Sequence, residues 1–393
     1  MLQRPSYILP CIVLAQLLGT STWFAGNAIL PVLQEQWGLA DSAVAPLTNS
    51  VQLGFIVGAL VFAVLTLADR LSPRVLFFLS ALGGAFFNSL IALWAETLED
   101  ILLLRFLGGF FLAGVYPVGM KIASAWYPEG LGRALGFLVG ALVIGTASAH
   151  LFSALVAEQW RYVIYLCSAA SFIGGLVILF GVPDGPAMHR GAPLRLSGLI
   201  AASRQPALRA SAGGYFGHMW ELYAVYALVP YWLLAWSAQH HQDLSVSLWA
   251  FVIIGIGGLG CMVGGYVSLR TGSRRVAAVN LAVSGCCCVL SPLIFASDLF
   301  ALVLFFWLVW GWSVAADSPQ FSSLSAQTAP SDAVGSALTM INAVGFTITI
   351  IAVQLTGWLL TYVPVQWVMW LLIPGPIFGL LSLRRLQTLR PTL

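Results

Sequence analysis

Leu65-Thr-Leu-Ala-Asp69-Arg70-Leu-Ser72-Pro-Arg74 is a short polar break between two long apolar stretches of the chain. A related break, Gly265-Tyr-Val-Ser-Leu269-Arg270-Thr-Gly272-Ser-Arg274, follows 200 residues later, and the arginines of the two segments coincide at that offset. A second match joins two pairs of prolines that share an eleven-residue spacing: Pro117 with Pro128, and Pro319 with Pro330. Such self-similarity indicates two halves related by duplication.

The composition around these breaks is typical of a membrane protein. Of the 393 residues, 60% are apolar and only 8% are charged, whereas a soluble domain carries roughly 25% charged residues. Apolar stretches that reach the length of a bilayer span, about 20 residues, recur along the whole chain. The 17 basic residues are scattered over short connections, whereas a nucleic-acid-binding protein would cluster them on one face. We therefore expect the lipid bilayer as the main surrounding and no nucleic-acid partner.

Twelve apolar stretches are expected to cross the membrane as helices. The longest break between them runs from Pro183 to Ala207 and divides the spans six and six. We therefore predict an all-α polytopic membrane protein with about 12 transmembrane helices, arranged as two pseudo-symmetric six-helix bundles at 1–183 and 208–393, joined by a cytoplasmic linker at 184–207. The expected spans are 6–30, 44–68, 74–95, 101–126, 134–157, 160–182, 208–236, 246–268, 276–296, 299–327, 334–360 and 364–383.

Arginines set the expected orientation, because cytoplasmic connections carry an excess of Lys and Arg. With the N-terminus in the cytoplasm, fourteen arginines fall on the cytoplasmic side and only Arg161 falls on the other. The opposite connections carry acids such as Glu35, Asp41 and Glu158. An even number of spans then places both termini in the cytoplasm, and we expect a multi-pass protein of a bacterial inner membrane.

The two polar breaks make the sequence resemble the major facilitator superfamily. The family's motif between spans two and three has the form G-x-L-A-D-R-x-G-R-R, which Asp69, Arg70 and Arg74 match in the first break. Arg270 and Arg274 match it in the second break, where leucine stands in place of the acid. In the family this loop latches helix ends in the outward-open state, so the resemblance implies a gating role for these five residues.

Span four and the segment after it extend the resemblance over nearly the whole chain. Arg105 and Gly109 match the family's R-x-x-x-G pattern. Residues 126–136 resemble the W-[FY]-P-x-x-x-R-A-x-G segment common among carriers of organic anions. The Gly-Pro of the antiporter motif in span five is missing, because Thr146 follows Gly145. The resemblance implies the family's fold and transport by alternating access, and it leaves the subfamily open.

Span seven carries two ionisable residues at the depth of the membrane centre. At 1.5 Å per residue from Arg209, His218 lies roughly 14 Å deep and Glu221 roughly 18 Å. Charged groups at this depth usually face a cavity and have a function, and residues three apart share one face of a helix. We expect both side chains in a wetted pocket, where either could carry a proton. The alternative is a structural hydrogen bond that fixes helix packing.

Other intramembrane groups are candidates for binding a substrate. Asp317 precedes a proline in span ten and could bind an ion, a proton or the substrate, or could be hydrated at the cytoplasmic mouth. Arg105 and Lys121 in span four could supply positive charge to an anion, or could extend to the membrane surface. Tyr116 lies eleven residues from Arg105, about three helical turns, and is expected on the same face; Tyr223 is a further substrate-binding candidate. Softer candidates for the cavity lining are Gln16, Trp23, Asn27, His150, Asn342 and Gln354.

We therefore expect a secondary active transporter that moves a small organic anion or zwitterion by alternating access, coupled to protons. Proton-driven efflux of a metabolite or drug is the alternative direction. A non-transporting sensor would need a signalling domain, and an enzyme would need a motif such as H-E-x-x-H or G-x-S-x-G; the sequence has neither. A copper carrier is less favoured, because neighbouring residues such as His218 and Met219 point about 100° apart on a helix. We expect no cofactor, no metal and a monomer.

Overall fold

The computed structural model describes residues 5–127, 131–156, 159–186, 205–330 and 334–389. Within these ranges all regular elements are helices and no strand is present. Ten stretches in the described part are long and apolar enough to cross a membrane. They are formed by α3 (Val44–Val64), α5 (Pro73–Trp94), α6 (Leu98–Leu112) with α7 (Tyr116–Trp126), α8 (Leu131–Val156), α9 (Trp160–Gly181), α12 (Val246–Thr271), α13 (Ser273–Phe295), α14 (Phe300–Ala316) with α15 (Ser318–Thr328), α16 (Val334–Leu359), and α17 (Val365–Val368) with α18 (Pro374–Leu389).

Two further segments complete the predicted set of about twelve spans. The first expected span is interrupted and forms α1 (Ile8–Gly19) and α2 (Ala25–Trp37). The seventh is α11 (Pro206–Gln239), a continuous helix whose polar residues include His218 and Glu221. Such a helix is tolerated in a bilayer because other helices, rather than lipid, surround its polar groups. The prediction of an all-α polytopic fold is confirmed.

The two halves break their fourth and tenth spans at equivalent places. The break between α6 and α7 falls just before Pro117, and the break between α14 and α15 falls just before Pro319. Each proline occupies the first turn of the second helix, where its missing N–H leaves no hydrogen bond unmade. The proline repeat read from the sequence therefore marks one structural feature that occurs in both halves.

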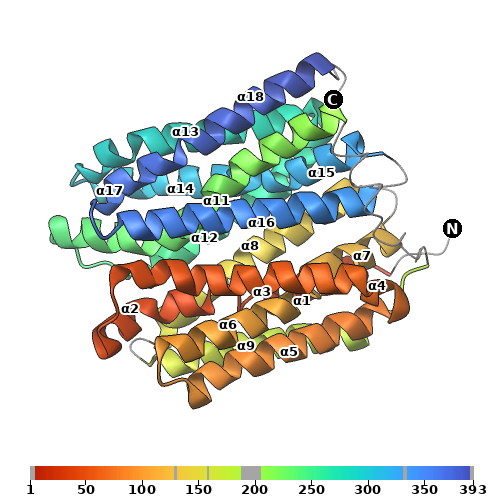
Figure 1. Ribbon diagram of the computed structural model, residues 1–393, viewed down its shortest axis with the longest axis horizontal. Helices are drawn as coiled ribbons and strands as arrows, with labels where there is room; N and C mark the ends of the chain where they lie inside the picture. Colours follow the sequence, from red (N-terminus) through yellow and green to blue (C-terminus); the bar gives the residue numbers. More distant parts are fainter. Residues whose placement is uncertain (1–4, 128–130, 157–158, 187–204, 331–333, 390–393) are drawn as a thin grey trace.

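The helices separate into two groups that follow the order of the sequence. In Figure 1, α1 to α9 (red to yellow-green) form one side of the molecule and α11 to α18 (green to blue) form the other. At the boundary α8 packs against α12 and α3 packs against α16. Most of the predicted linker, 187–204, lies outside the described residues, so the boundary at 184–207 stays a prediction.

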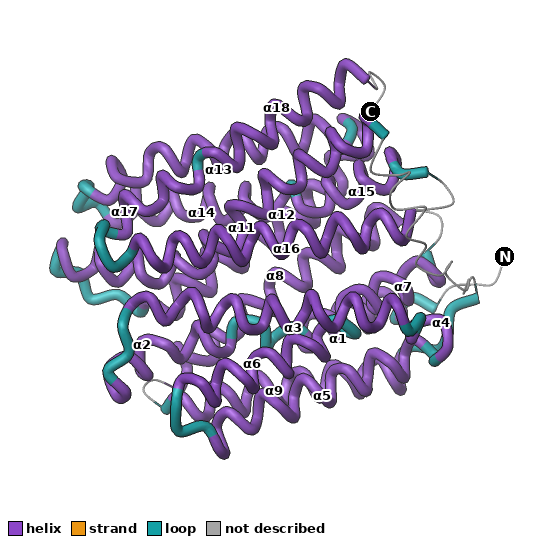
Figure 2. The backbone as a smooth tube through the Cα atoms, viewed as in Figure 1, coloured by secondary structure: helices purple, strands orange, loops and turns teal. Residues whose placement is uncertain are grey.

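Connections gather at two ends of the helical bundle, as Figure 2 shows. Helix α1 begins and α18 ends at the same end (Figure 1), as an even number of spans requires. We name it the arginine end, because the connections that carry Arg70, Arg74, Arg270 and Arg274 lie there. The other end is called the opposite end below.

Candidate functional site

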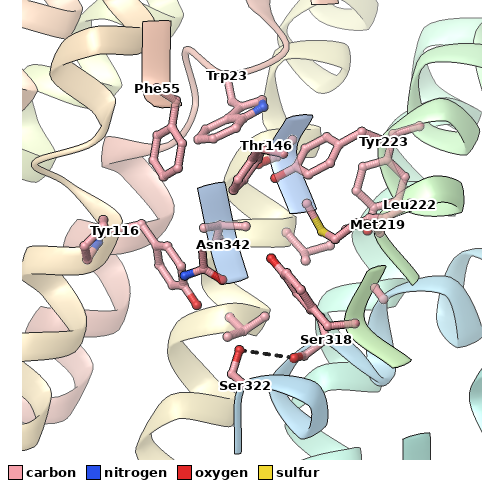
Figure 3. A pocket seen from close by; sticks show the side chains of 18 residues that line it. Trp23, Phe55, Tyr116, Thr146, Met219, Leu222, Tyr223, Ser318, Ser322 and Asn342 are labelled. Carbon is pink, nitrogen blue, oxygen red and sulfur yellow. Dashed lines mark hydrogen bonds between the residues drawn. The ribbon is translucent and has the colours of Figure 1, made fainter. Parts of the chain in front are cut away.

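A pocket lies between the two groups of helices and contains about 720 Å³ of empty space, part of which is open to solvent. The α1–α2 connection with α3, α7 and α8 forms one wall, and α11, α14, α15 and α16 form the other. Trp23 and Phe55 lie at one end of the pocket in Figure 3, and Ser318 and Ser322 lie at the other. Sites between helices of a bundle commonly bind small molecules, and this one takes its walls from both halves.

Aromatic rings from both halves meet at the Trp23 end of the pocket. Trp23 stacks on Tyr223, with ring centroids 5.7 Å apart and planes inclined by 21°. Phe55 of α3 contacts Phe346 of α16 at 4.8 Å between centroids, and Phe346 also contacts Trp23 at 5.8 Å. These four rings form one continuous cluster, which we call the aromatic cluster, across the boundary between the halves.

Side-chain hydrogen bonds join the halves beyond this cluster, toward the opposite end. Asn49 Nδ2 on α3 donates to Gln354 Oε1 (3.1 Å) and to the carbonyl oxygen of Ile350 (3.2 Å) on α16. Ser153 on α8 and Ser247 on α12 share a hydrogen bond of 3.2 Å. Asn49 lies six residues nearer the opposite end than Phe55 on the same helix, a rise of about 9 Å. The pocket is therefore closed toward the opposite end by hydrogen bonds and by the aromatic cluster.

Glycines bring α8 and α12 into backbone contact along the same boundary. A Cβ atom at Gly140 would lie 2.6 Å from the carbonyl oxygen of Gly258, and a Cβ at Gly258 would lie 2.6 Å from that of Gly140. Only glycine permits this approach, which is the usual reason for small residues between membrane helices. The glycine run of span eight thus serves helix packing.

The pocket lining contains no charged side chain among the described residues. Of the expected substrate-binding residues, Tyr116 and Tyr223 line the pocket, as do Trp23 and Asn342 among the softer candidates. Arg105, Lys121 and Asp317 are not part of the lining, and neither are Gln16, Asn27, His150 and Gln354.

Arg105 shows why the expected arrangement of span four was wrong. Tyr116 begins a new helix after the break at Ala113–Val115, so a count of three continuous turns from Arg105 does not apply. Arg105 is only 3% exposed, and its guanidinium donates to the carbonyl oxygens of Thr22 (2.7 Å) and Trp23. The guanidinium therefore stabilises the connection between α1 and α2 and does not face the pocket.

His218 and Asp317 form a buried pair behind the pocket wall. His218 Nδ1 lies 2.9 Å from Asp317 Oδ1, and their side chains are 1% and 0% exposed. The second ring nitrogen, Nε2, and Asp317 Oδ2 contact no hydrogen-bond partner within the described ranges. Asp317 sits at the break between α14 and α15, and the residue after it, Ser318, lines the pocket. The pair thus connects α11 to a pocket wall.

Glu221 faces a different part of the C-terminal half. Its carboxylate accepts hydrogen bonds from Trp310 Nε1 (2.8 Å), Ser284 Oγ (2.9 Å) and Cys288 Sγ (3.4 Å). Glu221 and His218 are each 1% exposed, so the expectation that both lie in a wetted pocket was wrong. Helix α11 has protein on all sides, and its pocket-facing residues are Tyr215, Met219, Leu222, Tyr223 and Tyr226.

The two copies of the loop motif make different contacts at the arginine end. In the first, α4 (Leu67–Arg70) is held by Lys121 Nζ, which donates to the carbonyl oxygen of Ala68 (2.6 Å). Arg74 Nε lies 3.8 Å from Asp184 Oδ1. In the second copy Arg274 donates to Gln387 Oε1 (3.0 Å). Arg70 and Arg270 are exposed, and the side chain of Asp69 is not described. Lys121 therefore lies next to the loop motif, away from the pocket.

Several lining residues were not candidates from the sequence. Thr146 of α8 and Ser318 and Ser322 of α15 supply hydroxyl groups, and the Ser322 hydroxyl donates to the Ser318 carbonyl oxygen (3.4 Å; Figure 3). The one sequence signal that could have identified Ser318 and Ser322 as lining residues is their position next to Pro319, just after the break between α14 and α15. Thr146 carried no such signal, because small hydroxyl side chains are common in membrane helices.

Comparisons with known proteins agree with this architecture. The chain is similar to the 4-hydroxybenzoate transporter PcaK of Pseudomonas aeruginosa, with 28% identity over 45% of this chain and 39% of that protein. It is also similar to a gallate transporter of Pseudomonas putida, with 27% identity over 66% of this chain and 65% of that protein. Both matches thus span less than two thirds of the relative's length.

A solved structure matches over a greater length. A bacterial homologue of the human lysosomal transporter Spinster, in an inward-facing and occupied conformation, aligns with a TM-score of 0.72 over 99% of this chain and 97% of that one. At 14% sequence identity, this likeness shows the fold alone. The model of the Major Facilitator Superfamily matches residues 12–294. The chain therefore belongs to the major facilitator superfamily of membrane transporters.

Proposed function

We propose that this chain is a secondary active transporter that takes up a small aromatic solute by alternating access, coupled to protons. The observation that carries the proposal is the pocket itself, which lies between the two halves, is closed at the opposite end and is walled by aromatic rings. Sites of secondary transporters lie at the interface of their repeats, where rocking of one half against the other exposes them to each side in turn.

The aromatic cluster favours a flat, ring-containing solute. Trp23, Tyr223, Phe55 and Phe346 offer faces and edges at 4.8–5.8 Å between neighbouring centroids, and aromatic pairs at such distances attract each other beyond their buried area. The relatives named for 4-hydroxybenzoate and gallate support this class of solute.

The His218–Asp317 pair is the proposed site of proton coupling. It is fully buried, it joins an imidazole of span seven to a carboxylate of span ten, and it adjoins the wall residue Ser318. Intramembrane acids and histidines placed in this way form proton relays in pumps and transporters. Glu221 remains a second candidate for the proton, held by three donors in the same half.

Orientation and gating complete the proposal. We place the arginine end on the cytoplasmic side of a bacterial inner membrane, with both termini on that side and residues 184–207 as a cytoplasmic linker. We assign Asp69, Arg70, Arg74, Arg270 and Arg274 to the loop that latches helix ends during transport. The transporter acts as a monomer, because the pocket takes its walls from one chain.

Uptake of radiolabelled 4-hydroxybenzoate and 4-hydroxybenzamide into proteoliposomes, with and without an imposed pH gradient, tests the proposal. If acid inside the vesicles drives accumulation of the solute instead, the protein exchanges solute for protons. In a cell such an exchange exports the solute. We expect acid outside to stimulate uptake by about fivefold or more, the low end of measured coupling between two ligands. Asp317→Asn should lose the stimulation, whereas Asp298→Asn, which changes an exposed acid of the same type, should keep it. Full stimulation in Asp317→Asn would contradict the role of the pair.

A further inference from the structure

Five ionisable side chains of the described spans near the pocket, those of Arg105, Lys121, His218, Glu221 and Asp317, contact protein groups outside its lining. Arg105 is held by two carbonyl oxygens of the α1–α2 connection, and Lys121 by that of Ala68. His218 contacts Asp317, and Glu221 accepts three hydrogen bonds in the C-terminal half. None of them belongs to the pocket lining.

We infer that the pocket selects the uncharged form of an aromatic solute, an amide or an undissociated acid, over its carboxylate. This inference rests on the proposed function and names the substrate class of the same site. A carboxylate that binds between the pocket walls loses part of its hydration shell, and the described lining offers no cation in return. Burial of an unpaired charge is far more costly than burial of a neutral polar group. The arrangement therefore disfavours the anion that the sequence alone had suggested.

Three residues of the pocket wall also carry buried, neutral polar atoms that have no hydrogen-bond partner in the described part of the chain. These atoms are Trp23 Nε1, Thr146 Oγ1 and the hydroxyl oxygen of Tyr226. An indole N–H only donates, whereas the two hydroxyl groups both donate and accept. An amide or a carboxylic acid group also does both, so it can accept from the indole N–H and can either donate to or accept from the hydroxyl groups. An unsatisfied buried group is costly, and a neutral polar ligand removes that cost without adding a charge.

A matched pair of ligands separates charge from shape. 4-Hydroxybenzamide and 4-hydroxybenzoate share a ring, a hydroxyl and nearly the same size, and at about pH 7.5 only the latter is charged. Binding of each to the full-length protein in detergent micelles is measured by calorimetry. We expect the amide to bind at least about tenfold more tightly, since its transfer carries no charge into the pocket. Affinity for the acid should rise as the pH is lowered and its undissociated form accumulates.

A substitution in the lining gives the reverse test. Asn342→Lys places a cation at the wall and should shift the preference toward 4-hydroxybenzoate, whereas Asn342→Gln keeps the wall neutral and should keep the preference for the amide. Equal or tighter binding of the carboxylate by the unchanged protein would overturn the inference and leave the proposed transport of aromatic solutes standing. If neither compound binds or is transported, the proposed aromatic substrate fails, and the inference fails with it.

Discussion

Arg105 is a buried cation whose contacts explain how the first span can be interrupted inside a membrane. The break between α1 and α2 leaves carbonyl groups without helical partners, and a bilayer supplies no water to satisfy them. The guanidinium donates to the carbonyl oxygen of Trp23 and to that of Thr22, which also accepts a hydrogen bond from Ala25 N–H (3.3 Å). Because Trp23 belongs to the aromatic cluster, Arg105 fixes the backbone from which one pocket wall projects.

Replacement of Arg105 by glutamine should therefore loosen the pocket as well as the fold. Each carbonyl left without a donor costs about 1–3 kcal/mol, so we expect a lower Tm and weaker solute binding. Arg105→Lys should recover only part of the loss, because an ammonium lacks the planar fork that reaches two acceptors at once. Thermal unfolding and calorimetry measure both effects. Arg384→Gln, at an exposed position, is the control, and equal Tm values for the two glutamine variants would contradict the proposed clamp.

At this scale the sequence predicted burial better than it predicted neighbours. Depth counting placed His218 and Glu221 inside the membrane, and both are 1% exposed, although protein surrounds them in place of the expected wetted pocket. Their partners were not predictable, because Trp310, Ser284 and Cys288 come from spans nine and ten, and only the packing of three helices brings them to Glu221. Periodicity also cannot tell which side of a helix faces a cavity when protein surrounds the whole helix, as in α11.

Among the elements, α8 and α12 form the tightest contact between the two halves. Their backbones meet at Gly140 and Gly258, where each helix leaves no room for a Cβ atom of the other. Small residues let helices approach, and span eight carries glycine at positions 255, 257, 258 and 260. The sequence did not indicate the partner helix, because α8 belongs to the other half and Gly140 lies 118 residues before Gly258 in the chain.

Alanine at Gly258 should force these two helices apart and slow transport. The added methyl group would lie 2.6 Å from the carbonyl oxygen of Gly140, and such overpacking costs about 1–3 kcal/mol. We expect a lower Tm and a reduced uptake rate in proteoliposomes. Gly255→Ala is a matched control on the same helix, because its methyl group would meet only Phe251 at 3.9 Å. Identical rates for the two variants would show that α8 and α12 do not need this contact.

For the whole molecule, the sequence predicted an all-α fold with about twelve spans, and the connections between helices gather at two ends of the bundle (Figure 2). The repeated prolines, Pro117 and Pro319, each lie just after a helix break, whereas the sequence predicted each of these spans as one continuous stretch. The sequence could not predict which end of the pocket is closed, because that depends on the relative orientation of the two halves. The two arrangements of an alternating-access transporter share one sequence and nearly the same contacts within each half.

The hydrogen bonds that close the opposite end should break each time the pocket opens toward that side. Asn49 and Gln354, which lie on different halves and are joined at 3.1 Å, can be replaced by cysteines in a background without the six native ones. A short cross-link between them should hold the molecule in the closed arrangement and stop transport, and a reductant that cleaves the link should restore it. The control is a link between Gln34→Cys and Asp41→Cys, two residues joined at 3.0 Å within one half. That link leaves the halves free to move against each other and should allow transport. Full transport by the protein with the Asn49–Gln354 link would contradict the prediction, because the opposite end would then stay closed throughout the cycle, which alternating access does not permit.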